Sequence, residues 1–159
     1  MTAQPDAVSL REITKDTVKS ILALEVAEGQ EDLVGDNGNS LAQALFEEKA
    51  WYRGIYAGDE PVGFLMLSID REKPEFYLWR FMIDAKQQRK GYGKRAIELL
   101  IEEVRAQPEA KELTLHVMDL PHSAVSFYEA LGFKLTGERD GDELVMSLPL
   151  RSEEHTSEL

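Results

Sequence analysis

The sequence predicts an α/β domain with a mixed β-sheet, and three observations lead to that prediction. Short runs rich in β-branched and aromatic residues, bounded by turn residues, predict strands. Longer segments with apolar residues three and four positions apart predict helices. The segments follow one another as a strand, two helices, three strands, a helix, a strand, a helix and two strands. This order is typical of a mixed sheet that is covered by helices.

The first expected elements are a strand and two helices. An alternating run over residues 8–13 predicts the strand. Asp16 is a suitable N-cap for a helix whose apolar residues have helical spacing, and Gly29 is expected to end that helix. Ser40 is expected to cap a second helix that continues to Phe46.

Three strands are expected next. Residues 51–57 and 62–69 are both β-rich, and the turn at 58–61 between them predicts a hairpin. Residues 76–83 form a third run of strand-forming residues, which we expect to be a central strand.

The longest amphipathic helix is expected to begin at Gly93 and to end before Pro108. Residues 113–118 predict another strand, and a strand–helix–strand unit of this kind normally places its two strands in parallel. A short helix over residues 122–131 and a final hairpin with an Asp-Gly turn at 140–141 complete the domain.

Length and composition limit the classes of function. The chain has 159 residues, which suits one compact domain, and it has no cysteine, which excludes disulfides, cysteine-ligated metals and thiol catalysis. The net charge of −12 disfavours nucleic-acid binding and suits a cationic partner.

No apolar run is long enough to span a membrane, and residues 1–6 are too short and polar for a secretory signal. We therefore expect a cytoplasmic protein without a membrane partner.

We expect a single domain over residues 1–150. Residues 151–159 are polar and aperiodic, and we expect them to be a non-native or disordered tail. This tail carries one Arg and three Glu, so the rest of the chain keeps a net charge of about −10.

The segment 86–95 holds five cations and no acid between an expected strand and the start of a helix. The first N–H groups of a helix have no intrahelical partner, and the helix dipole is positive at that end. Gly91 and Gly93 lack a Cβ atom, so a ligand can approach the backbone closely. These features predict a pyrophosphate cradle. On these features alone, a basic surface turn with two glycines explains the segment equally well.

Two motifs resemble those of the GNAT superfamily of N-acetyltransferases. Residues 88–93, Gln-Arg-Lys-Gly-Tyr-Gly, resemble its Arg/Gln-x-x-Gly-x-Gly/Ala signature, and residues 124–133 are similar to its Ala-x-x-Phe/Leu-Tyr-x-x-x-Gly-Phe block. The element order from 8 to 148 also matches. Residues 78–84 look most like the diamine and spermine/spermidine acetyltransferase branch.

The resemblance implies a mostly antiparallel sheet of six to seven strands, with central parallel strands that splay apart and about four flanking helices. It also implies acetyl-CoA as co-substrate. Backbone amides of the signature would hold the pyrophosphate, and the preceding strand would pair with the pantetheine arm. The expected cofactor contacts are Met82, Ile83, Gln88, Arg89, Lys90, Gly91, Tyr92, Gly93 and Lys94.

Tyr128 matches the family's tyrosine that protonates the departing thiolate. Such a donor assists the reaction because a coenzyme thiolate leaves better when it is protonated. Without the motif, a tyrosine that only packs the core would be the better interpretation. Pro121 stands where many family members have an asparagine that contacts the cofactor arm, so that one contact is not expected here.

The general base is not evident from the sequence. Tyr77 and Trp79 stand where some family members have a carboxylate, and Glu75 is the nearest acid. We expect Glu75, an acid from the first two helices, or ordered water to take the proton. His116 and His122 are not at metal-ligand spacing with other residues, so we expect no metal site and interpret both as structural or incidental.

Seven acids and no Lys or Arg occur between residues 24 and 48. In the resembling fold this stretch walls the acceptor side, so the expected substrate contacts are Glu25, Glu28, Glu31 and Asp32. A small polycationic amine such as a diamine, spermidine or spermine suits such a wall. The alternatives are an ordinary solvated acidic face, a protein N-terminus or lysine as acceptor, and a CoA-binding module without turnover. A homodimer is left open.

Overall fold

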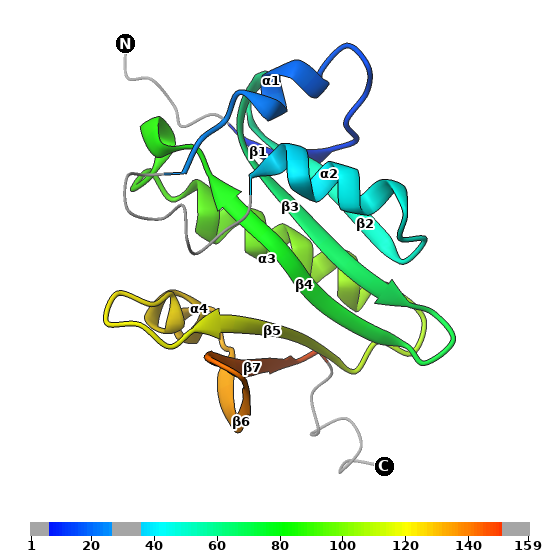
Figure 1. Cartoon of the computed structure of the whole chain (residues 1–159), viewed down its shortest axis with the longest axis vertical. Coiled ribbons are helices and arrows are strands. Elements are labelled where there is room, and N and C mark those ends of the chain that lie inside the picture. The colour runs from blue at the N-terminus through cyan, green and yellow to red at the C-terminus, as the bar shows by residue number, and fades with distance from the viewer. Residues whose placement is uncertain (1–6, 27–35, 151–159) are drawn as a thin grey trace.

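The computed structural model describes residues 7–26 and 36–150, which form a seven-stranded sheet with helices on both faces (Figure 1). The strands are β1 (Val8–Arg11), β2 (Ala50–Ala57), β3 (Glu60–Asp70), β4 (Glu75–Ile83), β5 (Glu112–Met118), β6 (Lys134–Asp140) and β7 (Glu143–Pro149). The helices are α1 (Val18–Leu22), α2 (Asn37–Leu45), α3 (Tyr92–Arg105) and α4 (Val125–Ala130), with a 3-10 turn η1 (Ala85–Gln87). The predicted order of elements is confirmed. None of the described helices is long and apolar enough to cross a membrane.

The strands lie in the order β1-β2-β3-β4-β5-β7-β6, so β4 is the central strand, as predicted. Every neighbouring pair is antiparallel except β4 and β5, which are parallel. Helix α3 connects these two parallel strands. The predicted mixed, mostly antiparallel sheet is therefore confirmed.

The two parallel strands pair over only three residues each. Their register runs from Phe76 opposite Leu113 to Leu78 opposite Leu115, although β4 continues to Ile83. The pairing of β4 with β3 shifts at this point, so that Trp79 is an extra residue in β4. Such a bulge bends a strand and increases its twist. Beyond Leu78, β4 and β5 therefore diverge (Figure 1), which is the expected splay.

The sheet buries an apolar cluster on each face. Helix α3 contributes a stripe at helical spacing to the larger cluster: Ala96, Ile97, Leu100, Ile101 and Val104. On the opposite face, α1 and α2 cover a smaller cluster formed by Ile21, Tyr56, Phe64, Met66 and Met82. The face of β4, β5 and β7 beyond α2 carries no described helix.

Helix α1 is shorter than predicted, because hydrogen bonds from other parts of the chain replace its own. A continued helix would bond the Glu25 N–H to the Ile21 carbonyl. Instead, the Glu25 N–H donates to the Asp84 carboxylate (2.9 Å), and the Ile21 carbonyl accepts from the Asn37 side-chain amide (2.8 Å). Thr17 rather than Asp16 is the N-cap residue, and its side chain makes no cap bond. Gly29 lies outside the described residues.

Helix α2 begins before Ser40, which was expected to cap it. Asp36 is the N-cap, and its carboxylate accepts a hydrogen bond from the Asn39 N–H at 2.7 Å. Ser40 is buried within the first turn, where its hydroxyl donates to the Asp36 carbonyl. An ionised aspartate accepts such a bond strongly, so the helix starts at the aspartate.

Gly63 provides a stability test of the β3–β4 contact that holds the splayed strand in place. A Cβ atom at this position would overlap the Met82 carbonyl oxygen and would lie 2.9 Å from Ile83 Cδ1. We expect Gly63→Ala to lower the free energy of unfolding by about 1–3 kcal/mol, the usual cost of overpacking, as measured by urea denaturation. Gly38→Ala, where the nearest atom is a side-chain oxygen at 3.3 Å, should cost far less. Equal stabilities of Gly63→Ala and the wild type would contradict this contact.

Candidate active site

A cavity of about 740 Å³ opens where β4 and β5 separate. Its walls come from residues 77–83 on β4, residues 115–118 on β5, the turn before α3, the start of α4, and Glu143 on β7. This volume suits a ligand of coenzyme or drug size. The divergence of the two parallel strands therefore creates the cavity, and the N-terminal ends of α3 and α4 contribute to its wall.

The glycine turn before α3 offers open backbone to this cavity. Gly91 is the N-cap of α3 in a left-handed conformation (φ 83°), and a Cβ atom there would meet nothing within 4 Å. Arg89 is also left-handed (φ 66°). Helix α3 has no side-chain cap, so the N–H groups of its first turn are available to an anion. This geometry fits the predicted pyrophosphate cradle.

Eight of the nine residues expected to contact the cofactor line the cavity: Met82, Ile83, Gln88, Arg89, Gly91, Tyr92, Gly93 and Lys94. Lys90 does not line it; its ammonium group is exposed and donates to the Gln87 side chain at 2.9 Å. The Gln88 side-chain amide donates to the Ile83 carbonyl (3.0 Å), which ties the turn to the end of β4.

Gly93 lies beside β4 and α4. A Cβ atom at this position would lie 3.4 Å from Ile83 Cγ1 and from Phe81 Cζ, and 3.6 Å from Phe127 Cζ, which are ordinary van der Waals distances. The packing here therefore does not require a glycine. Gly91 is the glycine that is open to a ligand.

Tyr128 lies in the cavity wall and packs the core at the same time. Its ring makes edge contacts with Phe127 (5.1 Å between centroids) and Phe133 (5.5 Å). The side chain is buried, and burial raises the pKa of Tyr128 well above its ordinary value. Its phenol is therefore protonated at neutral pH, and within the described residues its hydroxyl makes no hydrogen bond. This group can donate a proton or a hydrogen bond into the cavity.

Glu75 lies at the wrong end of its strand for the role expected of it. It is the exposed first residue of β4, opposite Asp70 of β3, whereas the cavity is lined from Tyr77 to Ile83. The side chain is not part of the cavity wall. The geometry therefore gives no support to Glu75 as the general base.

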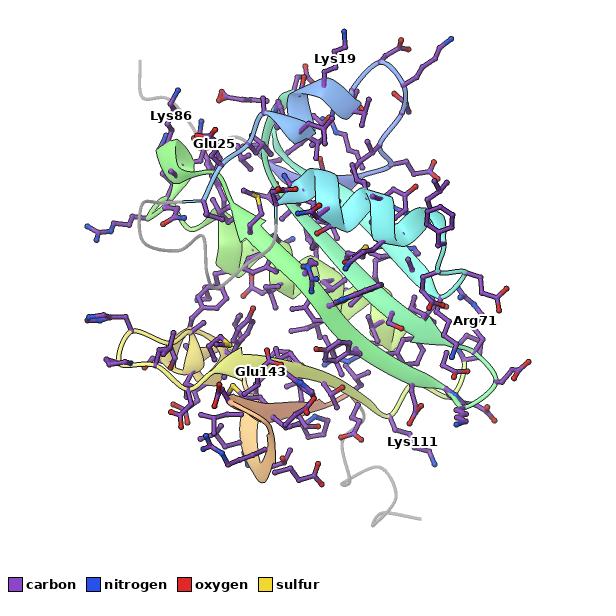
Figure 2. All side chains as sticks on the ribbon, in the orientation of Figure 1. Lys19, Glu25, Arg71, Lys86, Lys111 and Glu143 are labelled. Carbon is purple, nitrogen blue, oxygen red and sulfur yellow. The ribbon has the colours of Figure 1, made fainter. Side chains whose placement is uncertain are left out.

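The described acids of the first two helices do not wall the cavity. Glu25 is exposed and lies beside η1, near Lys86 (Figure 2), where its carbonyl accepts from the Ala85 N–H. Its neighbour Val26 lines the cavity. The Asp36 carboxylate is used to cap α2. Glu28, Glu31 and Asp32 lie outside the described residues, so their expected contacts stay predictions.

The structure gathers a group that the sequence analysis missed. His116 of β5 lines the cavity, and its Nδ1 atom lies 3.6 Å from Asp140 Oδ2 and 3.7 Å from Glu143 Oε1. Tyr77 contacts the imidazole ring edge-on at 5.0 Å. His116 is therefore not an isolated histidine, contrary to expectation. Pairing of β5 with the final hairpin would have predicted this group, because that pairing brings the acids of the hairpin next to β5.

Arg80 adds a positive charge to the same cavity. Its guanidinium donates to the Trp79 carbonyl (3.0 Å) and to the Gln43 side chain (3.2 Å), while its Nε atom is buried without a hydrogen-bond partner. Burial and the nearby Glu143 raise the pKa of Tyr77, and Arg80 opposes that shift. The cavity therefore contains both signs of charge.

Comparison with known proteins identifies the family of this fold and site. The model of the acetyltransferase (GNAT) family matches residues 18–133, which include both motifs. The chain belongs to the GNAT acetyltransferase family. This membership confirms the predicted family, fold and enzyme class, and it disfavours a module without turnover.

Relatives of the chain differ in the acceptor that their names state. The chain is 28% identical over 142 residues to the spermine/spermidine N(1)-acetyltransferase of Bacillus subtilis (strain 168), covering 84% of this chain and 92% of that protein. It is 30% identical over 135 residues to the peptidyl-lysine N-acetyltransferase YjaB of Escherichia coli (strain K12), covering 85% of this chain and 78% of that protein.

A solved structure with the same fold was crystallised with coenzyme A. It is the PaiA N-acetyltransferase of Thermoplasma acidophilum, which superposes with a TM-score of 0.67 at 17% identity and covers 90% of this chain and 99% of its own. The GNAT fold of this chain therefore occurs in a protein that binds the coenzyme.

Proposed function

We propose that this GNAT enzyme transfers the acetyl group of acetyl-CoA to a primary amine of a small polycation, such as a diamine, spermidine or spermine. The observation that carries the proposal is the cavity itself. It joins the N-terminus of α3, which suits an anion, to the carboxylate of Glu143, which suits a cation.

The residues present fit acetyl-CoA. The N–H groups around Gly91 and the first turn of α3 are placed to hold the pyrophosphate. Beyond Leu78, the edge of β4 that faces β5 has no strand partner within the described residues, so its backbone is free to pair with the amides of the pantetheine arm. Arg89 and Lys94 line the cavity and supply positive charge near the phosphates.

The proposed reaction is a direct attack. The neutral amine attacks the thioester carbonyl, a carbon–nitrogen bond forms, the carbon–sulfur bond breaks, and the nitrogen loses one proton to solvent as the amide forms. Tyr128 gives its proton to the departing thiolate, because burial keeps its phenol protonated. A backbone N–H of the unpaired β4 edge polarises the carbonyl oxygen as negative charge develops on it.

The polycation as acceptor is supported by the acids and aromatic rings of the cavity. Glu143 lines it, with Asp140 close by, and the aromatic residues Tyr77 and Trp79 also line it. The relative named spermine/spermidine N(1)-acetyltransferase supports the same acceptor. The relative named peptidyl-lysine N-acetyltransferase favours a second candidate, a protein lysine. Arg80 also lines the cavity, and its positive charge would repel an acceptor ammonium group placed next to it.

A thiol-release assay with acetyl-CoA separates these acceptors. We expect turnover with spermine, spermidine or putrescine to exceed turnover with lysine-containing peptides. The apparent KM for spermine should rise steeply between about 0.1 M and 1 M salt, because the Debye length falls from about 10 Å to about 3 Å. It should rise less for a monoamine such as propylamine. Turnover with peptides alone would reject the polycation as acceptor.

A further inference from the structure

The β5 wall of the cavity presents an imidazole whose two nitrogens face different surroundings. His116 Nδ1 faces the carboxylates of Asp140 and Glu143, at 3.6 Å and 3.7 Å. The side chain is half-buried and lines the cavity. Because the two nitrogens lie on opposite edges of the ring, Nε2 is directed away from the carboxylates. Within the described part of the chain, Nε2 makes no hydrogen bond.

Residues from four strands meet at this ring. His116 itself comes from β5, and Tyr77 of β4 packs edge-on against the ring with an interplanar angle of 70°. Asp140 and Glu143 flank the tight turn between β6 and β7, and Glu143 pairs with Met118 at the end of β5. Figure 2 shows Glu143 beside β5, in front of the sheet. The imidazole therefore lies between the Tyr77 ring and the two carboxylates.

Charged side chains from neighbouring strands surround the ring. Asp140 on β6 and Glu143 on β7 contribute two negative charges on the Nδ1 side. Tyr77 of β4 also faces the ring, and it remains neutral because burial raises its pKa. Arg80, also on β4, is the opposing charge, and its guanidinium is bonded to the Trp79 carbonyl and the Gln43 side chain. An imidazolium formed here would thus face two carboxylates.

We propose that His116 is the proton acceptor for the attacking amine, and that Asp140 and Glu143 are positioning residues that hold its Nδ1–H. The inference rests on the proposed amine acetylation. The acceptor ammonium gives one proton to Nε2 and becomes the neutral nucleophile. Its nitrogen bonds to the acyl carbon, the carbon–sulfur bond breaks, Tyr128 protonates the thiolate, and the nitrogen gives its second proton to solvent, which leaves a neutral amide. Solvent then takes the proton from His116 and restores one to Tyr128.

His116 fills the role for which the sequence offered only Glu75, water or the acids of the first helices. Glu75 is outside the cavity wall, and the described acids of the first helices are too. His122 also lines the cavity, but it is exposed, and no ion pair joins it to a described carboxylate. Among the histidines that the structure describes, only His116 combines a cavity position with carboxylates at one nitrogen.

An amine series tests this assignment directly. We expect His116→Asn to lower kcat by about 10²–10⁴-fold with propylamine or spermine, which are protonated at neutral pH. The variant should lose far less with 2,2,2-trifluoroethylamine, which is already neutral at the assay pH. Equal losses for all amines would overturn the proposal, because a merely structural defect does not depend on the basicity of the amine.

Chemical rescue provides a second measurement. Adding imidazole to His116→Ala should restore kcat at least about tenfold with propylamine, since the cavity left by the ring can admit a free base. Glu143→Gln should lower kcat with a small change in the KM for acetyl-CoA, whereas Asp142→Asn removes the same charge from an exposed neighbour outside the cavity wall and should behave as wild type. Failure of imidazole to rescue a folded variant would overturn the assignment.

Two further outcomes are informative. Activity that a chelator abolishes and a divalent cation restores would overturn the proposal, since the cluster would then hold a cation rather than a proton. Turnover of peptides but not of polyamines would reject the proposed acceptor class. In that case the wild type and His116→Asn would be compared on a lysine-containing peptide at several pH values. The acceptor class and the role of His116 are therefore tested separately.

Discussion

Replacing Tyr128 by phenylalanine should lower kcat by about 10²–10⁴-fold, the range for loss of a positioned acid. The phenol is the group that we propose protonates the departing thiolate. The substitution removes one oxygen and leaves the ring, so the edge contacts with Phe127 and Phe133 are retained. The affinity for acetyl-CoA and the melting temperature should therefore change little. Steady-state kinetics and calorimetric titration with acetyl-CoA measure the two effects.

Tyr56→Phe is a matched control for this prediction. Tyr56 is also a buried tyrosine, but it belongs to the cluster under α1 and α2 and does not line the cavity. It should keep wild-type turnover. If Tyr128→Phe also keeps wild-type turnover, Tyr128 is a packing residue and another group protonates the thiolate.

Gly91→Val should abolish measurable binding of acetyl-CoA while leaving the helix content nearly unchanged. The glycine has a φ of 83°, which a β-branched residue adopts only with strain, and the space beside it is open to the ligand. A valine there either occupies the approach of the pyrophosphate or turns the backbone N–H groups away from it. Calorimetric titration gives the affinity, and circular dichroism gives the helix content.

Gly137→Val separates backbone strain from loss of the cradle. Gly137 has a similar φ of 91°, and a Cβ atom there also meets nothing within 4 Å, but it lies on β6 outside the cavity wall. Both valine variants should lose stability, and only Gly91→Val should lose acetyl-CoA binding. Unchanged affinity in Gly91→Val would reject the assigned cradle.

The sequence by itself determined the features that depend on neighbours along the chain. The order of the elements follows from apolar periodicity and turn residues, which are local signals. The glycine turn and Tyr128 were both expected at the site from short contiguous motifs, and the structure places both in the wall of one cavity. In each case the residues that carry the signal lie within about one turn or one strand of each other.

The tertiary structure decided the features that depend on residues far apart in sequence. Helix α1 ends at Leu22 because Asn37 and Asp84 compete for its backbone groups, and no local pattern records that competition. Glu75 was a poor choice of base because position along a strand does not reveal which end of the strand meets the cavity.

The His116 cluster is the clearest case of the same limit. His116, Asp140 and Glu143 come from three strands, and only the register of β5 with β7 brings them together. The splay that opens the cavity likewise depends on the bulge at Trp79, which exists only as a mismatch between β4 and β3. Strand register is set by cross-strand packing, so a single strand's sequence determines its faces but not its partners.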